Sequence, residues 1–289
     1  MTYSPLATPR ATRDTLAAHG LTTKKSLGQH FLVDDNVVGR ILGLAGSDLE
    51  GATVLEIGPG IGTLTLALCE RAGAVVAVER DRGLEPVLTA TLRDCPRVTV
   101  LFEDAVKVSP DQITAPFGPP AALVANLPYA VAATVILRCF ETLPSLRYAV
   151  VMVQAEVADR MTAVPGTKDY GSYSVKLQLL AWPAGRFAVA RGCFMPPPRV
   201  DSAVVRFDRR EGLAPAGVIE VASAVADIAF AQRRKTLRNT LRNGLPGGAQ
   251  SADALLSSAG IDGIRRAESL SVAEYVHLGG KALELGLLP

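Results

Sequence analysis

The sequence predicts an α/β protein in which a mostly parallel sheet is followed by a small, all-helical domain. Three observations support this prediction. The chain has 289 residues, of which 48% are hydrophobic and 20% charged, so it can bury one large core and one smaller one. Short β-branched runs alternate with longer amphipathic stretches from residue 53 onward. After Phe207 this alternation gives way to helical periodicity alone.

Five short apolar runs have the length and the β-branched content of buried strands. They are Thr53–Ile57, Val75–Glu79, Val98–Phe102, Ala121–Asn126 and Tyr148–Val153. Because helical patterns fill most of the gaps between them, we expect βαβ units and a Rossmann-like parallel sheet.

The end of the α/β part has a different pattern. Ser174–Ala181, Phe187–Ala190 and Val200–Phe207 follow one another without long helices between them. We therefore expect these segments to be antiparallel strands that complete the sheet.

The helical part begins after a linker rich in Gly, Pro and Ala at Glu211–Gly217. Apolar residues then recur with the period of an α-helix in Val218–Gln232, Arg233–Arg242, Ala252–Ala259 and Val272–Leu285. We expect an irregular arm over residues 1–35, an α/β domain over 36–210 and a helical domain over 211–289. The α/β domain should begin with a helix at Asn36–Leu44.

Composition argues against several classes of protein. Met1–Arg13 is polar and no segment has 18 consecutive apolar residues, so we expect a cytoplasmic protein without signal peptide or membrane anchor. The four cysteines are widely spaced and the three histidines scattered, which predicts free thiols and no metal site. The net charge is only +2, but residues 186–289 carry 14 basic and 10 acidic side chains, a mild indication of a polyanionic partner.

A glycine-rich turn follows the first predicted strand and precedes a predicted helix at Thr63–Ala72. It reads Leu55-Glu56-Ile57-Gly58-Pro59-Gly60-Ile61-Gly62. Glycines allow a sharp turn and close approach of a ligand, while the helix N-terminus offers free N–H groups. On its own, such a turn is equally well explained as a tight connection between a strand and a helix.

Two carboxylates strengthen the interpretation of this turn as a ligand site. Glu79 ends the next predicted strand, 19 residues after Gly60, where an acidic group can bind both ribose hydroxyls of an adenosine. Asp104 follows the third strand at the same edge of the sheet and is placed to accept from an adenine amino group. Together with Glu56 and Gly58, these residues predict an adenosine-containing ligand, which a dinucleotide-binding enzyme would also satisfy.

Asn126-Leu127-Pro128-Tyr129 closes the fourth predicted strand and favours a methyl donor instead. An aromatic amine is a poor nucleophile because its lone pair is delocalised into the ring. If the Asn126 amide oxygen and the Leu127 carbonyl accept its two hydrogens, the lone pair turns toward the donor methyl. Pro128 fixes the turn, and Tyr129 offers a flat face on which a flipped-out base can stack.

These motifs predict methyl transfer to the exocyclic N6 of adenine, with S-adenosylmethionine as donor, S-adenosylhomocysteine as product and no metal. A second aromatic residue, Phe194, precedes the run Met195-Pro196-Pro197-Pro198-Arg199, which could hold its ring over the other face of the base. Taken alone, Phe194 is better explained as a core residue. The Asn-Leu-Pro-Tyr segment alone is equally well explained as a turn with a core tyrosine.

Taken together, the motifs resemble the KsgA-type small-subunit ribosomal RNA adenine dimethyltransferases, close relatives of the macrolide-resistance adenine methyltransferases. The resemblance runs from about Lys25 to Val276. Besides the two motifs above, it rests on Ser26-Leu27-Gly28-Gln29-His30-Phe31-Leu32, Phe194–Val200, Asp201-Ser202-Ala203-Val204-Val205 and Gln232-Arg233-Arg234-Lys235-Thr236-Leu237-Arg238-Asn239. One departure is Ala155, which stands where the family usually has a lysine.

The resemblance implies a class I methyltransferase fold and dimethylation of two adjacent adenosines. These adenosines lie in a hairpin loop near the 3′ end of 16S rRNA, in the small ribosomal subunit or its late assembly precursor. It also implies roles for single residues. His30 and Leu32 would contact the methionine end of the donor, and the donor would closely approach the backbone at Gly58. Glu79 would bind the ribose, Asp104 the adenine and Asn126 the reacting amine.

Basic residues of the helical domain predict the RNA-binding surface. Arg234, Arg238 and Arg242 recur every four residues, so on one helix they would form a stripe beside Arg233 and Lys235. Such a stripe is usually only a solvated face, but RNA helices are bound chiefly through phosphates and shape. Lys24 and Lys25 extend the predicted surface from the arm. We expect the protein to act as a monomer.

Two other functions remain open at this point. A large-subunit rRNA methyltransferase that confers macrolide resistance would share the catalytic motifs, although the Gln-Arg-Arg-Lys-Thr block and Ser271-Val272-Ala273-Glu274-Tyr275 favour the small-subunit enzyme. A non-catalytic RNA-binding assembly or transcription factor could keep the same fold. Intact cofactor and target positions argue against the non-catalytic alternative.

Overall fold

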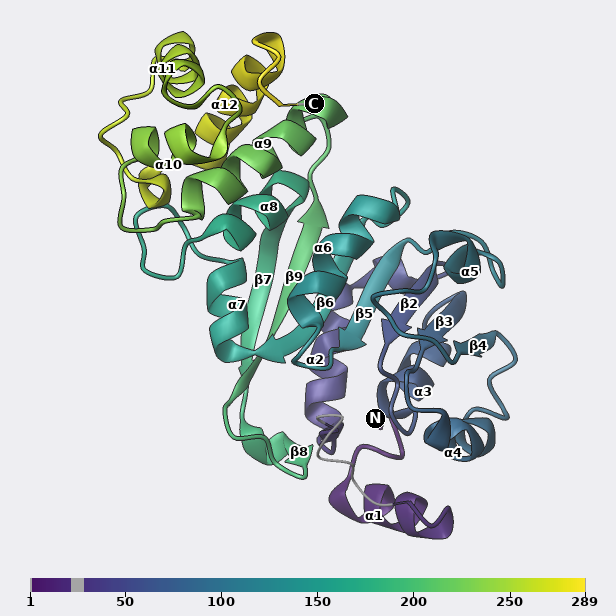
Figure 1. Cartoon of the computed structure of the whole chain (residues 1–289). Coiled ribbons are helices and arrows are strands. Elements are labelled where there is room, and N and C mark those ends of the chain that lie inside the picture. The colour runs from purple at the N-terminus through teal and green to yellow at the C-terminus, as the bar shows by residue number, and fades with distance from the viewer. Residues whose placement is uncertain (1, 22–28, 289) are drawn as a thin grey trace. The chain divides into compact units, whose positions relative to one another are not determined.

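The computed structural model describes residues 2–21 and 29–288. Its main sheet has seven strands in the order β4-β3-β2-β5-β6-β9-β7 (Figure 1). The strands are β2 (Thr53–Ile57), β3 (Ala74–Val78), β4 (Val98–Leu101), β5 (Ala122–Asn126), β6 (Tyr148–Gln154), β7 (Ala181–Val189) and β9 (Ser202–Arg209).

The strand order places a topological switch point between β2 and β5. From β2 the chain moves outward through β3 and β4, and then returns to the other side of β2 with β5 and β6, all in parallel pairs. β9 runs antiparallel to β6, as expected for the end of the sheet. In open parallel sheets, ligands bind at the carboxyl ends of the strands beside such a switch point.

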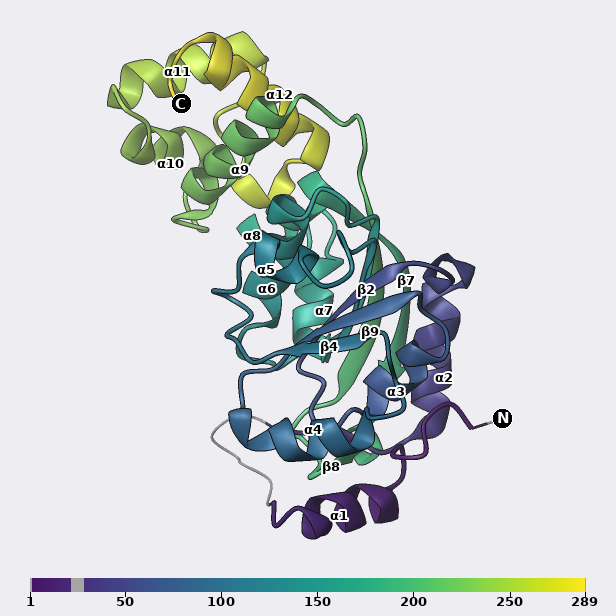
Figure 2. The same cartoon turned by 90° about the vertical axis from the view of Figure 1, so that its right-hand side faces the viewer.

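Helices cover both faces of this sheet (Figure 2). On one face lie α2 (Asp35–Ala45) and α3 (Thr63–Cys69), and on the other α6 (Ala132–Thr142) and α7 (Ala155–Met161). Side chains of α2, including Val38 and Ile41, are completely buried against the sheet residues Val54, Val124 and Val150. The β-branched strands predicted from sequence thus form the central layer of the core.

The N-terminal arm is more regular than the sequence predicted. It contains α1 (Pro9–Ala18), which begins where the Thr8 hydroxyl accepts from the Ala11 amide and where proline occupies the first helical position. Near the end of the arm, β1 (Phe31–Leu32) pairs with β8 (Phe194–Met195) in a small second sheet. The α/β part also contains the α-helices α4 (Glu85–Thr91) and α5 (Pro110–Thr114).

The prediction of a strand at Ser174–Ala181 is wrong, because these residues form α8 (Ser172–Leu180) and β7 begins only at Ala181. Apolar and polar residues alternate here, which imitates a strand, but the side chains are buried on more than one face of a helix. Gln178 donates to the carbonyls of Met161 and Ala163, and α8 packs on α9 and α12. Tertiary packing therefore decides the conformation of this segment.

The chain divides into two compact units, and the second comprises residues 159–182 and 210–289. The division near residue 210 lies next to the predicted linker, whereas residues 159–182, which include α8, belong to the unit that contains the C-terminal helices. The helical core has its own completely buried residues, among them Tyr275 and Leu255. Its helices after the linker are α9 (Ala216–Phe230), α10 (Leu237–Gly244), α11 (Gly248–Ala259) and α12 (Val272–Glu284).

Helix α10 is shorter at its start than the predicted helix at Arg233–Arg242. It begins at Leu237 because the amides of Leu237 and Arg238 donate to the carbonyls of Arg265 and Gly263 instead of continuing a helix. Arg233, Arg234 and Lys235 consequently lie in the turn before α10. Within residues 2–21 and 29–288, no helix is long and apolar enough to cross a membrane.

Candidate active site

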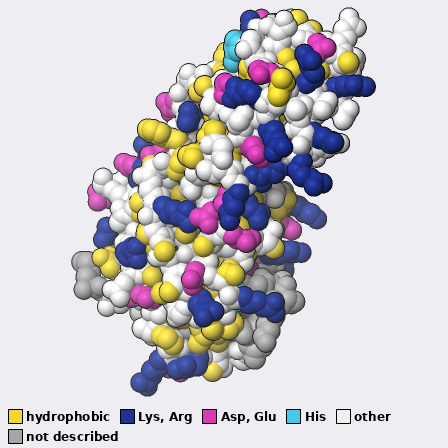
Figure 3. Space-filling view, turned by 90° about the vertical axis from the view of Figure 1, so that its left-hand side faces the viewer, with side chains coloured by type: hydrophobic (Ala, Val, Ile, Leu, Met, Phe, Trp, Pro, Cys, Tyr) yellow, Lys and Arg dark blue, Asp and Glu magenta, His cyan; other side chains and the backbone are white. Residues whose placement is uncertain are grey.

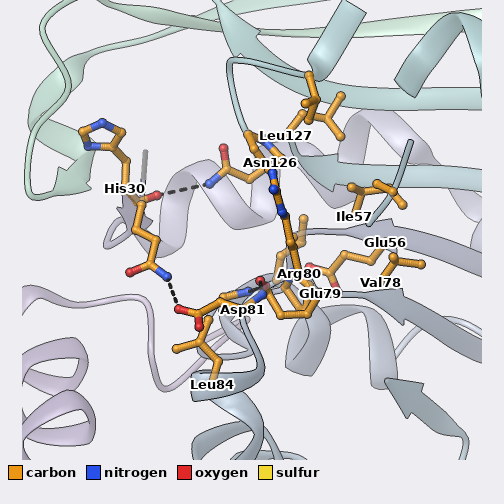
Figure 4. Close-up of a pocket in the computed structure, with 18 of the residues that line it drawn as sticks. His30, Glu56, Ile57, Val78, Glu79, Arg80, Asp81, Leu84, Asn126 and Leu127 are labelled. Carbon is orange, nitrogen blue, oxygen red and sulfur yellow. Dashed lines mark hydrogen bonds between the residues drawn. The ribbon is translucent and has the colours of Figure 1, made fainter. Parts of the chain in front are cut away.

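A pocket of about 440 Å³ opens at the carboxyl ends of the parallel strands (Figure 4). It brings together eleven of the residues that the sequence predicted for the donor and the target base. These are His30, Leu32, Glu56, Gly58, Gly60, Glu79, Asp104, Asn126, Leu127, Pro128 and Tyr129. They come from four strand ends and from the last residues of the arm, so the sheet edge assembles most of them.

The glycine-rich turn after β2 forms one wall of the pocket. Gly58 has φ of +72° and Gly60 of +62°, a region that residues with a side chain rarely adopt. A Cβ atom at Gly58 would lie 3.3 Å from the Pro128 side chain, and one at Gly60 would lie 3.2 Å from the Phe31 ring. Both glycines are thus required by backbone conformation and by close packing.

Glu79 lies next to this turn and is held by backbone amides. Its carboxylate accepts from the Gly60 amide at 3.3 Å and from the Asp81 amide at 2.8 Å. Burial raises the pKa of Glu79, and the two amide donors act in the opposite direction. Each carboxylate oxygen has a second lone pair, so the fixed group can still accept from a diol.

Asp104 lies three residues after β4, at the same edge. One carboxylate oxygen accepts from the Val106 amide at 2.9 Å, and the other is 3.9 Å from the Arg80 Nε atom. Arg80 also lines the pocket, although the sequence did not single it out. The orientation of Asp104 is therefore fixed by one amide and one neighbouring cation.

Glu56 is buried at the base of the pocket, with 1% of its surface exposed. Burial raises its pKa to about 8; the nearby Thr65 hydroxyl lowers the pKa, and the Glu79 carboxylate raises it further. The Glu56 Oε2 atom has no hydrogen-bond partner among the described residues. A buried carboxyl group with an unpaired oxygen is unusual in a core and typical of a functional site.

Asn126 ends β5 and projects toward the pocket (Figure 4). Its Nδ2 atom donates to the His30 carbonyl at 3.4 Å, so its Oδ1 atom is the end of the amide that remains as an acceptor. The Leu127 amide donates to the Met152 carbonyl of β6 at 3.1 Å. Both contacts fix the start of the Asn-Leu-Pro-Tyr turn.

Tyr129 completes this turn and contacts two residues distant in sequence. Its hydroxyl lies 2.7 Å from the Ser202 hydroxyl, and its ring stacks with the His30 ring at 5.9 Å between centroids and 26° between planes. Burial raises the pKa of Tyr129, while the Ser202 hydroxyl lowers it. The His30 Nδ1 atom lies 2.7 Å from the Pro196 carbonyl, which can only accept, so Nδ1 carries the proton.

The structure does not bring Phe194 to the pocket. Its ring is 3% exposed and belongs to the hydrophobic core around Leu32, its partner in the two-stranded sheet. Sequence reasoning also missed Gln29, whose amide donates to the Asp81 carboxylate at 3.0 Å, and both residues line the pocket. Gln29 adjoins His30 in the matching Gly-Gln-His stretch, which was the available signal.

The predicted basic stripe is not continuous. Arg233 pairs with Glu268 at 3.0 Å, and Arg238 pairs with Asp253 at 2.9 Å. Arg234, Lys235 and Arg242 are exposed, but only Arg242 shares α10 with Arg238. Figure 3 shows basic side chains interspersed with acidic ones along one edge of the helical unit. Lys24 and Lys25 lie outside the described residues.

The described side chains include no cluster suited to a metal ion. Within residues 2–21 and 29–288, no three His, Cys, Asp or Glu side chains come together in this way. The described part of the pocket is lined by four carboxylates, Glu79, Asp81, Glu103 and Asp104, against the single guanidinium of Arg80. A fifth acidic residue, Glu56, keeps its proton below a pH of about 8 because its burial raises its pKa. The site is thus electrostatically suited to a cationic organic ligand.

The strand order, the switch point and the antiparallel β9 define a class I methyltransferase fold. A dimethyladenosine transferase from Plasmodium falciparum superposes with a TM-score of 0.74 at 22% identity, covering 89% of this chain and 99% of that one. The 23S rRNA methyltransferase ErmE superposes with a TM-score of 0.65 at 27% identity, covering 87% and 98%.

The sequence comparisons are more specific than the fold. Residues 20–278 match the model of the ribosomal RNA adenine dimethylase family, and the chain belongs to this family. It is 42% identical to the ribosomal RNA small subunit methyltransferase A of Anoxybacillus flavithermus over 96% of each chain. Its identity to the protein of the same name from Geobacillus thermodenitrificans is 41%, over 98% of this chain and 99% of that one.

Proposed function

We propose that the protein transfers methyl groups from S-adenosylmethionine to N6 of two adjacent adenosines of 16S rRNA. The adenosines would lie in a hairpin loop near the 3′ end, in the small subunit or its late assembly precursor, and become N6,N6-dimethyladenosine during ribosome biogenesis. The observation that carries this proposal is the Asn126–Tyr129 turn, which shares a wall of one pocket with the glycine-rich turn.

The pocket fits the proposed donor. About 440 Å³ lies within the range of roughly 300–1,000 Å³ typical of sites for small organic ligands. Its surplus of carboxylates suits a sulfonium cation, and the unpaired Glu56 oxygen offers an acceptor. In this proposal Glu79 accepts from the ribose hydroxyls, Asp104 accepts from the adenine amino group, and His30, Leu32 and Gly58 contact the methionine end. The donor supplies an electrophilic methyl group.

The chain itself prepares the nucleophile. With Nδ2 held by the His30 carbonyl, the Asn126 Oδ1 atom accepts one N6 hydrogen, and the Leu127 carbonyl accepts the other. These two bonds draw the nitrogen toward a tetrahedral shape and orient its lone pair toward the donor. Tyr129 stacks on the flipped-out adenine. The methylated nitrogen is briefly cationic and loses its proton readily, so the mechanism requires no strong base.

A second transfer to the same nitrogen follows from the same geometry. After the first methylation the amine retains only one hydrogen, so one of the two acceptors is left without its partner. Stacking on Tyr129 and the remaining hydrogen bond then keep the base in place. Because the acceptors are an amide and a backbone carbonyl, losing one partner leaves no unpaired charge.

The helical unit is the proposed contact surface for the RNA. Its exposed cations Arg234, Lys235 and Arg242 have no ion-pair partner within the described residues, so they are placed to bind phosphates. Lys24 and Lys25 belong to the same proposal. We propose a cytoplasmic protein that binds the ribosomal particle as a monomer.

A large-subunit rRNA methyltransferase is the second candidate, because ErmE shares the fold at 27% identity. The small-subunit proteins are considerably more similar, at 41% and 42% identity over almost the whole chain. A non-catalytic RNA-binding factor would not need the eleven predicted residues around one pocket. Small-subunit methylation is therefore the function best supported.

One experiment separates these functions. Labelled methyl donor is offered with small subunits from a strain that lacks this methylation, with mature small subunits and with naked large-subunit RNA. We expect label only in the first sample, as N6,N6-dimethyladenosine. Label in the large-subunit RNA would support the resistance enzyme, and absence of label from all three would support a non-catalytic factor.

A further inference from the structure

Ser202 is a completely buried polar residue beside the proposed target-base site. It is the first residue of β9, pairs in register with Gln154 of β6, and has 0% of its surface exposed. Its hydroxyl lies 2.7 Å from the Tyr129 hydroxyl, a contact that joins residues 73 positions apart in the chain. The proposed chemistry gives Ser202 no role of its own.

Two contacts restrain the Tyr129 side chain, and a backbone hydrogen bond closes the turn that carries it. The Val131 amide donates to the Pro128 carbonyl at 3.1 Å, which closes the turn at the base of the side chain. The His30 ring covers one face, and Ser202 holds the hydroxyl at the far end. His30 is itself fixed, because Pro196 accepts from its ring and Asn126 donates to its carbonyl.

We propose that Ser202 is a positioning residue for the target adenine, acting through the Tyr129 hydroxyl with the His30 ring as support. This inference rests on the proposed function, in which the adenine stacks on Tyr129. A ring held in its stacking plane before the base arrives has less freedom to lose on binding. It also fixes the height of the base, and hence of N6, relative to Asn126.

A purely structural role for this hydrogen bond leads to different expectations. If Ser202 only satisfied a buried hydroxyl, its loss would lower the stability of the fold and leave the kinetics of the folded enzyme unchanged. If it positions Tyr129, its loss changes how well the RNA substrate is used while the donor pocket, formed by Glu79 and Asp104, keeps its affinity. The two roles are therefore separable by measuring stability, donor binding and substrate kinetics together.

The test uses Ser202→Ala, Tyr129→Phe and the double variant. Both single substitutions remove the same hydrogen bond, and Tyr129→Phe keeps the stacking ring. Ser145→Ala is the matched control, since the Ser145 hydroxyl donates to the Pro120 carbonyl at 2.8 Å in a half-buried loop that does not line the pocket. Methylation of undermethylated small subunits is followed at several subunit concentrations, with calorimetric donor binding and thermal unfolding measured alongside.

We expect Ser202→Ala and Tyr129→Phe each to lower kcat/KM for the subunit by about two- to tenfold, the effect of one ordinary hydrogen bond. Most of the loss should lie in KM, with unchanged donor affinity. The double variant should be no worse than either single one, because the two changes remove one shared interaction. Ser145→Ala should methylate like the wild type.

Two results would overturn the inference while leaving the proposed function intact. One is wild-type methylation kinetics for Tyr129→Phe, which applies even if Ser202→Ala fails to fold. The other is a loss in the double variant equal to the product of the single losses, since independent effects contradict action through a shared bond. A wild-type protein that does not methylate undermethylated subunits would overturn the proposed function as well.

Discussion

Replacing Glu56 by Gln should change how the stability of the protein depends on pH. The folded Glu56 has a pKa of about 8, chiefly because of its burial, against an ordinary value of 4.5. Between these two pH values the folded protein keeps a proton that the unfolded chain releases. The unfolded state then binds fewer protons, so the free energy of unfolding decreases as pH rises from about 4.5 to 8.

The size of this effect follows from the two pKa values. At 1.36 kcal/mol for each factor of ten in proton affinity, Glu56 costs the folded protein about 5 kcal/mol above pH 8 relative to low pH. Natural domains are stable by only about 5–15 kcal/mol, so the effect should be measurable. Gln has nearly the same shape as Glu and no charge, and it removes the pH dependence that comes from this position.

The assay is urea unfolding of wild type and Glu56→Gln from pH 5 to pH 9, with the exposed Glu50→Gln as control. The variant should become more stable relative to the wild type as pH rises, while Glu50→Gln should follow the wild type throughout. Parallel curves for Glu56→Gln and the wild type would show that Glu56 ionises normally in the folded protein. The burial argument for this residue would then be wrong.

Three further predictions concern the function. Asn126→Ala should lower the rate of single-turnover methylation by a factor of roughly a hundred, about 3 kcal/mol, with little change in donor affinity. The reason is that the substitution removes an acceptor used mainly in the transition state. A rate near that of the wild type would refute the role of Asn126. Glu79→Gln should weaken the binding of S-adenosylmethionine, measured by calorimetry, by about 1.5–3 kcal/mol, the range for a hydrogen bond to a charged group. If the wild-type protein bound NAD instead of S-adenosylmethionine, the donor assignment would be contradicted. Reversing the charge of Arg234, Lys235 and Arg242 should weaken RNA binding and make it less dependent on salt concentration, without changing donor affinity. An unchanged salt dependence would show that these cations are only solvated.

Much of the sheet was predictable because buried strands leave a local signal. The β-branched run at Thr53–Ile57 coincides with β2, and the run at Tyr148–Val153 lies within β6. β9 is antiparallel to β6, as expected. Ser174–Ala181 was misjudged because its short alternating pattern suits a strand or a helix buried on several sides. Only contacts with α9 and α12, distant in sequence, decide between them.

That the residues assigned to the donor and the target base would line one pocket was predictable for a related reason. They follow the carboxyl ends of parallel strands, and the topology of such a sheet brings those ends to one edge. The contacts among Tyr129, Ser202 and His30 were not predictable, because they join residues 73 and more positions apart. Likewise, a basic pattern in the sequence does not reveal that Arg233 and Arg238 are paired with Glu268 and Asp253.

In the proposed function, the contact between the glycine-rich turn and the Asn-Leu-Pro-Tyr turn links donor binding to base positioning. Gly58 has a positive φ, and any side chain there would press on Pro128, the residue that follows the Leu127 carbonyl. In the proposed function, the glycine allows close approach of the donor on one side and correct placement of the Leu127 carbonyl on the other. The two turns meet because β2 and β5, the strands that they follow, are adjacent at the switch point. The strand order therefore brings the glycine-rich turn and the Asn-Leu-Pro-Tyr turn into contact.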